Sequence, residues 1–122
     1  MYSAQLLDHF ENPRNAGDVE GADARVRVEN PACGDILELS VRVVEGRIAD
    51  IRFRAKGCVP AIACGSLVTE LAMGKSVNEA RASISKSEIE SRIGGVPQAS
   101  GHAAQLAADA LRAALEKASE KD

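Results

Sequence analysis

The sequence predicts an α+β fold in which one small antiparallel sheet carries helices on one face. Alternating apolar and polar residues mark strands in the first half of the chain, whereas apolar residues at helical spacing dominate the second half. The links between the expected strands are too short for the crossover that parallel strands require. A chain of 122 residues without internal repeats fits one domain, and we expect residues 1–122 to form it.

An N-terminal helix and three strands are expected in the first half. Apolar residues lie at helical spacing within residues 2–12, and Pro13 ends that helix. In the middle strand Leu37 and Leu39 alternate with polar side chains, so one face of the sheet should be buried and the other wet. A turn at residues 45–46 joins the last two strands. The strands are expected at residues 25–28, 36–44 and 47–54.

Four helices are expected in the second half. Pro60 suits the first turn of a helix that ends at Gly74. The last helix carries a stripe of alanine and leucine side chains, which should pack against the rest of the domain. The expected helices cover residues 61–73, 77–82, 86–92 and 100–118.

Composition and charge exclude several functions. The net charge of −3 and the aromatic content of 2% provide neither a basic surface nor stacking platforms for nucleic acid. No apolar run approaches the roughly 20 residues that span a membrane. Residues 1–5 lack the pattern of a signal peptide, so the cytoplasmic compartment is expected. Three cysteines are too few for a disulfide framework and are expected as thiols.

Two loop cysteines carry the chemistry that the sequence suggests. Cys33 lies in a loop between two strands, and the Asp35 carboxylate follows two residues later. Cys58 lies just before the predicted helix, whose N-terminus favours a thiolate. Thiolate and carboxylate groups together suit iron or zinc. The alternatives are an exposed turn cysteine at position 33 and a small apolar side chain sealing the strand–helix junction at position 58.

Three further side chains are considered for the site. Cys64 lies about one turn into the helix among small apolar residues, a setting more typical of the core than of a ligand. His102 lies in the first turn of the last helix and can ligate a metal if that helix end faces the cysteine loops. His9, beside Asp8 on the first helix, is expected at the surface or in a partner contact.

Other types of site lack their motifs. The sequence has no Cys-x-x-Cys pair, no Gly-x-Ser-x-Gly elbow and no Walker loop. Two functions stay open on the cysteine, aspartate and histidine side chains. One is a structural or regulatory module that binds zinc. The other is a thiol enzyme in which a loop cysteine pairs with His102.

These residues resemble the IscU/NifU-type scaffolds of iron–sulfur cluster assembly. The resemblance extends over almost the whole chain, in segments that follow one another in the same order. The segments are residues 2–3, 8–15, 30–35, 56–58 and 61–63, then Ser66, residues 69–70 and 95–97, His102, and residues 106–107 and 109–111.

The resemblance implies the α+β fold and a scaffold that is not an enzyme. Such a scaffold accepts sulfur from a cysteine desulfurase, accepts iron, builds a transient iron–sulfur cluster and passes it to apo iron–sulfur acceptor proteins. A 2Fe–2S cluster is expected first and a 4Fe–4S cluster second, and zinc can take the cluster's place. By motif, Cys33 and Cys58 resemble the first two ligand cysteines. Asp35 resembles the carboxylate that keeps the cluster labile, and His102 the histidine before the third cysteine.

The sequence departs from the family pattern at three places. Ala103 stands where the third cysteine should follow His102, and Cys64 stands where a serine is common. Residues 96–100 lack the second proline and the lysine of the segment read by a DnaK-type chaperone, which argues against chaperone-driven release of the cluster.

Three ligand arrangements are therefore open. Cys64 can act as the third thiol beside the two loop cysteines, completed by His102 or Asp35. Alternatively, the two loop cysteines with Asp35 and His102 hold a cluster or a single metal ion. In the third arrangement the protein binds metal but builds no cluster. We favour a working scaffold with a rearranged site, and the candidate ligands are Cys33, Asp35, Cys58, Cys64 and His102.

Overall fold

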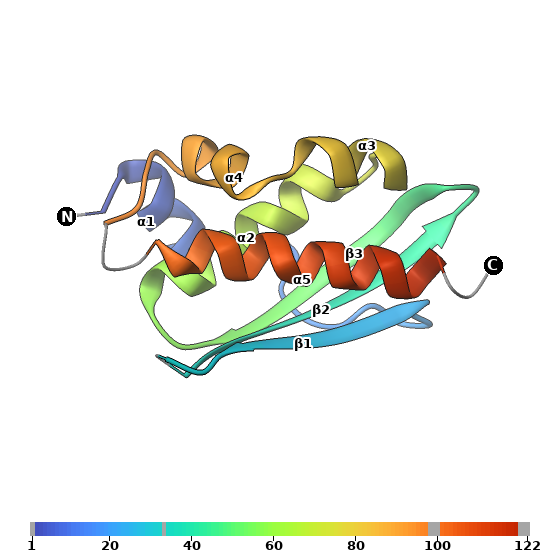
Figure 1. Cartoon of the computed structure of the whole chain (residues 1–122), viewed down its shortest axis with the longest axis horizontal. Coiled ribbons are helices and arrows are strands. Elements are labelled where there is room, and N and C mark those ends of the chain that lie inside the picture. Colours follow the sequence, from blue (N-terminus) through green and yellow to red (C-terminus); the bar gives the residue numbers. More distant parts are fainter. Residues whose placement is uncertain (1, 33, 98–100, 120–122) are drawn as a thin grey trace.

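The computed structural model describes residues 2–32, 34–97 and 101–119. These residues form three strands and five helices, which are arranged as an α+β fold (Figure 1). The elements in chain order are α1 (Ala4–Glu11), β1 (Ala24–Asn30), β2 (Asp35–Val44), β3 (Arg47–Lys56), α2 (Val59–Ala72), α3 (Val77–Ser83), α4 (Lys86–Arg92) and α5 (His102–Ser119).

The sheet is an antiparallel meander in the order β1-β2-β3. Leu39 lies at its centre, opposite Val26 on β1 and Phe53 on β3. Strands β2 and β3 are joined at Glu45 and Gly46, whose φ angles of 51° and 76° are those that a type I′ hairpin turn requires. The predicted fold class and the predicted order of strands and helices are thus confirmed.

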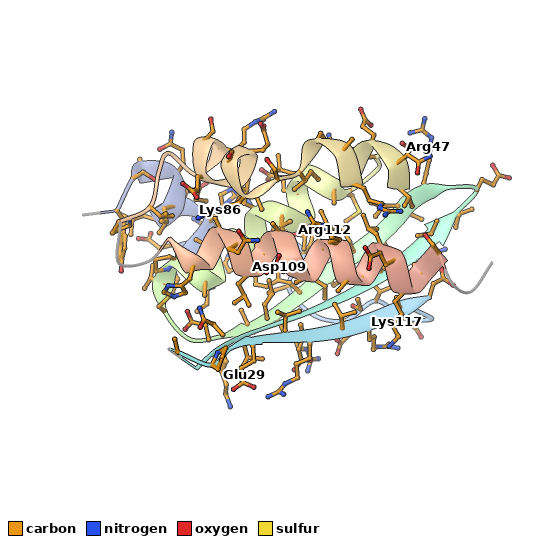
Figure 2. All side chains as sticks on the ribbon, in the orientation of Figure 1. Glu29, Arg47, Lys86, Asp109, Arg112 and Lys117 are labelled. Atoms are coloured by element: carbon orange, nitrogen blue, oxygen red, sulfur yellow. The ribbon has the colours of Figure 1, made fainter. Side chains whose placement is uncertain are left out.

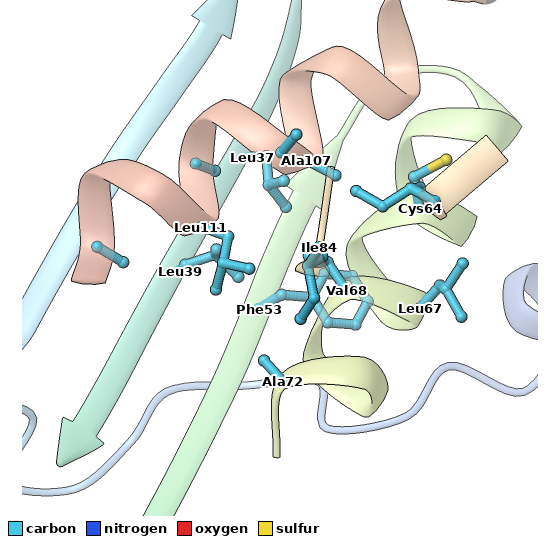
Figure 3. Close-up of a cluster of buried hydrophobic side chains, with 14 of the residues drawn as sticks. Leu37, Leu39, Phe53, Cys64, Leu67, Val68, Ala72, Ile84, Ala107 and Leu111 are labelled. Atoms are coloured by element: carbon cyan, nitrogen blue, oxygen red, sulfur yellow. The ribbon is translucent and has the colours of Figure 1, made fainter. Parts of the chain in front are cut away.

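Helices cover one face of the sheet, and the core lies between the two layers (Figure 1). Helix α5 packs over β1 and β2, whereas α2 packs mainly over β3 and also contacts α5. Leu37 and Leu39 of β2 point into this layer beneath α5, and Leu111 of α5 meets them there (Figure 3). The buried stripe of α5 is rich in alanine, so the helix can approach its neighbours closely.

The segment after α1 pairs with the outer edge of β3 and then crosses the face of the sheet opposite the helices. The Phe53 amide donates to the Asn15 carbonyl (3.0 Å), and the Gly17 amide donates to the Phe53 carbonyl (2.8 Å). The chain then crosses β2, where the amide of buried Val19 donates to Ser40 Oγ at 2.8 Å. Ser40, expected on the wet face, is therefore buried. The predicted loop is thus also a cover for this part of the sheet.

The ends of the elements differ from the predicted ones by a few residues. Helix α4 has the predicted bounds, but α2 begins at Val59 because Cys58 is its N-cap. Strand β1 runs on to Asn30, which pairs with Asp35 across the loop between β1 and β2. Ile36 at the start of β2 pairs with Lys56 at the end of β3, and α2 begins three residues later, so these three ends lie close together.

The surface is polar, and one of its charged groups ties α5 to the sheet. Figure 2 shows Lys117 near the C-terminal end of α5, beside β1. Its ammonium group donates to the Arg25 carbonyl oxygen at 2.9 Å. Within the described residues, no helix is long and apolar enough to cross a lipid bilayer.

Candidate metal and cluster site

Three element ends meet at one end of the sheet. Asp35 is the first residue of β2, Cys58 is the N-cap between β3 and α2, and His102 is the first residue of α5. One carboxylate oxygen, the thiol sulfur and one ring nitrogen of these residues lie within 4.8 Å of one another. The structure thus brings together three of the five candidate ligands, although they are far apart in the sequence.

Asp35 is the centre of this group. Its side chain is almost fully buried, with 3% of the residue exposed. Its Oδ1 accepts the Cys58 amide at 3.0 Å, and its Oδ2 accepts the Cys58 thiol at 3.2 Å. The same Oδ2 lies 3.2 Å from His102 Nε2. One buried carboxylate therefore fixes both the thiol and the imidazole.

The N-terminus of α2 makes a buried carboxylate acceptable here. Cys58 has an extended backbone (φ −71°, ψ 162°), and its side chain makes no capping hydrogen bond. Its amide, which a helix terminus otherwise leaves to water, is satisfied by Asp35. The helix dipole adds up to about 2 kcal/mol of stabilisation for a negative group in a partly buried position of this kind.

The donor atoms of this group could hold a metal ion. One sulfur, one carboxylate oxygen and one imidazole nitrogen suit zinc and iron better than magnesium or calcium, which prefer oxygen ligands. The Asp35 carboxylate also contacts the other two side chains of the group, the Cys58 thiol and His102 Nε2, and so fixes their positions. The His102 side chain is 31% exposed, so the group can be reached from solvent.

Cys33 lies outside the described residues, so its ligand role stays a prediction. Its neighbours on both sides are described: Gly34 donates its amide to the Asn30 carbonyl at 2.8 Å, and Asp35 follows. The loop that carries position 33 therefore starts and ends at the last pair of β1 and β2, Asn30 with Asp35.

Cys64 is a core residue in this structure. It has no exposed surface, and it lies among the buried side chains of α2, the sheet and α5 (Figure 3). Burial, reinforced by Cys58 and Glu90, raises the pKa of its thiol from 9.0 to about 12. Six residues separate it from Cys58, which is about 9 Å along an α-helix and a different side of it. Cys64 is thus not in the group of Asp35, Cys58 and His102, and its ligand role stays a prediction.

The position after His102 is also part of the core. Ala103 is 1% exposed and belongs to the same cluster of buried side chains as Cys64. The position at which the resemblance implies a third cysteine is therefore occupied by a buried apolar residue. The three ligand arrangements suggested by the sequence stay predictions.

His9 is buried, which corrects its predicted place at the surface. It is 6% exposed, and its Nδ1 lies 2.8 Å from Ser66 Oγ on α2. Ser66 Oγ also accepts the Arg14 amide at 2.8 Å, and His9 Nε2 lies 3.7 Å from a Glu70 carboxylate oxygen. A spacing of three residues from Leu6, the other buried residue of α1, is the signal that could have placed His9 inside.

A comparison of the sequence with known families identifies the chain. The family described as the NifU-like N-terminal domain matches residues 1–122. The chain belongs to this family. The resemblance read from the sequence is confirmed.

Two relatives are similar over most of their length. The chain is 45% identical over 115 residues to the iron–sulfur cluster assembly scaffold protein IscU 1 of Archaeoglobus fulgidus, covering 94% of this chain and 74% of the relative. It is 44% identical over 118 residues to the scaffold protein IscU of Escherichia coli K12, covering 93% and 91%. Both relatives are named as scaffolds of cluster assembly.

A solved structure shares the fold. The crystal structure of a NifU-like protein (N-terminal) from Brucella abortus superimposes with a TM-score of 0.83, covering 98% of this chain and 95% of that chain. The sequence identity is 18%, so this likeness shows the NifU-like fold alone.

Proposed function

We propose that this protein is a scaffold on which iron–sulfur clusters are assembled and from which they are transferred to apo acceptor proteins. The observation that carries the proposal is the meeting of Asp35, Cys58 and His102 at one end of a NifU-like domain. The relatives named as assembly scaffolds, 44–45% identical to this chain, support the same function.

The cluster is the cargo of this site. We propose Cys33, Asp35, Cys58 and His102 as its ligands, without Cys64. Four protein ligands are the number that a 2Fe–2S cluster takes, two on each iron. Soft thiolates bind iron–sulfur clusters more readily than carboxylates do, so a ligand set with one carboxylate should release its cluster more easily than four cysteines. That property is what a carrier needs.

The partners follow from the cargo. A sulfur donor of the cysteine desulfurase class and acceptors that lack their clusters are the proteins that such a scaffold must meet. We propose the cytoplasm as the compartment. The proposed site needs its cysteines as thiols, and the reducing conditions of the cytoplasm keep them so. A chaperone partner is not proposed, because residues 96–100 lack the matching proline and lysine.

A second candidate is a zinc-binding module on the same residues. The observation in its favour is the tight group of sulfur, oxygen and nitrogen donors, which suits a tetrahedral zinc ion as well as it suits iron. Metal analysis of protein purified without oxygen separates the two candidates, since a zinc module should retain stoichiometric zinc in the presence of ferrous iron and sulfide.

Anaerobic reconstitution tests the proposed function. The protein is incubated with ferrous iron, sulfide and a reductant, and visible absorption is followed before and after addition of an apo-ferredoxin. We expect a coloured protein whose absorption moves to the ferredoxin. Cys58→Ala should abolish the colour, whereas the matched change in the core, Cys64→Ala, should retain it. A wild-type protein that stays colourless would overturn the proposal.

A further inference from the structure

Gly57 lies directly against the Asp35 side chain. It is the residue between the end of β3 and the helix cap Cys58, and its φ of +139° is one that L side chains rarely adopt. A Cβ atom at this position would lie 2.1 Å from Asp35 Oδ1, 2.8 Å from its Cγ and 3.0 Å from its Cα. The first two separations are shorter than real Cβ contacts and the third is tighter than most, so a side chain at position 57 and the present position of the Asp35 carboxylate exclude each other.

Asp35 Oδ1, the atom that such a Cβ would collide with most closely, belongs to the carboxylate that contacts both Cys58 and His102. Asp35 Oδ1 accepts the Cys58 amide, while Oδ2 is shared by the Cys58 thiol and His102 Nε2. The Asp35 backbone is held by its pairing with Asn30 in the sheet, so we expect the carboxylate group to move most. Its displacement would separate it from both Cys58 and His102.

From this close approach we propose that Gly57 is a positioning residue of the site. Its missing side chain leaves the space in which the Asp35 carboxylate orients Cys58 and His102 for the metal or cluster. The proposal deepens the proposed function and rests on it for the identity of the cargo. The effect on the Asp35–Cys58 contact, however, exists in the metal-free protein and can be measured there.

The chain offers two matched control glycines. Gly17 has a similar φ of +125°, but a Cβ atom there would meet nothing within 4 Å. Gly34 precedes Asp35 directly, has a φ of +75° and would also meet nothing within 4 Å. Gly17→Ala reproduces the backbone strain of Gly57→Ala without the collision with Asp35. Gly34→Ala introduces strain next to Asp35, also without that collision.

The first measurement is hydrogen exchange of the Cys58 amide in the metal-free protein, followed by NMR. We expect this amide to be protected in the wild type, because it donates to the buried Asp35 carboxylate. Gly57→Ala should raise its exchange at least about 10-fold, as should Asp35→Ala, while amides in the middle of α2 keep their protection. Gly17→Ala should leave the Cys58 amide unchanged once any change in global stability is taken into account.

The second measurement is the affinity for Zn²⁺, by competition with a chromophoric chelator. Loss of an outer partner commonly lowers metal affinity about 10- to 100-fold, and displacing Asp35, a ligand that also orients Cys58 and His102, should cost at least as much in Gly57→Ala. Gly17→Ala and Gly34→Ala should stay within about twofold of the wild type, because neither collides with Asp35. In an Asp35→Ala background, Gly57→Ala should add less than about twofold, because the group through which it acts is gone.

The outcomes separate this proposal from the proposed function. A Gly57→Ala protein with a protected Cys58 amide and wild-type Zn²⁺ affinity would overturn the positioning role. So would equal losses in Gly57→Ala and Gly17→Ala, which would indicate backbone strain alone. If Gly57→Ala fails to fold, the double variant with Asp35→Ala should fold better, since two of the three colliding atoms are removed. A wild type that forms no cluster overturns the scaffold while leaving the exchange experiment valid.

Discussion

Two thiols six residues apart, one at the N-cap of α2 and one in its middle, have opposite surroundings. At its N-terminal end Cys58 is half-buried, caps the helix and donates to the Asp35 carboxylate. In its middle Cys64 has no exposed surface and belongs to the cluster of buried core side chains. The residue type and the helix are the same, and only the surroundings differ.

The difference shows what makes a cysteine available as a ligand in this fold. The helix N-terminus provides an amide donor and a favourable dipole, which together hold a carboxylate beside the thiol. The middle of the helix provides only apolar neighbours, and burial there raises the pKa of Cys64 to about 12. A cysteine ligand must lose its proton, so the buried middle of α2 is unfavourable for the metal binding that we propose at its N-terminal end.

Alkylation of the native protein should show the largest contrast between the two thiols. A pKa of about 12 instead of 9.0 leaves Cys64 with roughly 1000-fold less thiolate than an ordinary thiol, apart from the protection that burial adds. We expect iodoacetamide at mildly alkaline pH to modify Cys58 and to leave Cys64 unmodified until urea unfolds the protein. Both cysteines lie in the tryptic peptide of residues 57–75, so fragment ions must assign the modified one. Equal native rates would contradict the comparison.

The same substitution at both positions sharpens the comparison for metal binding. Serine replaces a thiolate ligand poorly, so Cys58→Ser should weaken Zn²⁺ binding by about 100-fold, the upper end of what outer partners alone cause. Cys64→Ser should stay within about twofold of the wild type, because its side chain is outside the group of Asp35, Cys58 and His102. Chelator competition measures both. A matching loss in Cys64→Ser would return Cys64 to the ligand set.

Much of the fold was predictable because its signals are local. The alternation around Leu39 gave the buried face of β2, and the Glu45-Gly46 turn gave the antiparallel partner. The cover formed by residues 15–19 was not predictable, because the amides of Gly17 and Val19 find their acceptors on strands that come later in the chain. Such tertiary hydrogen bonds leave no periodic pattern in the sequence.

The site was predictable in its residues but not in its geometry. Residue type and loop position pointed to Asp35, Cys58 and His102, and the structure brings these three together. The burial of Cys64 was not settled by the sequence, which gives a count of thiols and not the side of the helix on which each one lies. The role of Gly57 was not predictable either, since it depends on the distance between its Cα and a side chain 22 residues away.

For stability the order should be the reverse of that for metal binding: Cys64→Ser should lower the free energy of unfolding more than Cys58→Ser does. A serine hydroxyl at position 64 would enter an apolar core, where a poorly paired hydroxyl costs about 1–3 kcal/mol. At position 58 the hydroxyl can still donate to Asp35, so we expect a change below about 0.5 kcal/mol. Urea unfolding of the metal-free variants measures this, as a shift in midpoint at constant slope. A larger loss for Cys58→Ser than for Cys64→Ser would contradict the assignment of the two regions.

The smallest expected effect concerns His9, which is paired with the buried Ser66 in the middle of α2. Ser66 is fully buried, yet its hydroxyl is paired with His9 Nδ1 and with the Arg14 amide. Burial, and then the nearby Arg14 charge, lower the pKa of His9 below 6.5, while Glu70 and Asp8 oppose the shift. The native imidazole is therefore neutral at a pH where the unfolded chain already binds a proton.

Stability should consequently fall as the pH is lowered through 6.5, because protons then favour the unfolded chain. We expect the urea midpoint of the wild type to decrease more between pH 7.5 and 5.5 than that of His9→Gln, which has no proton to bind there but can still pair with Ser66. The difference between the two profiles isolates His9 from His102, which is present in both proteins. Parallel profiles would show that folding does not change the pKa of His9.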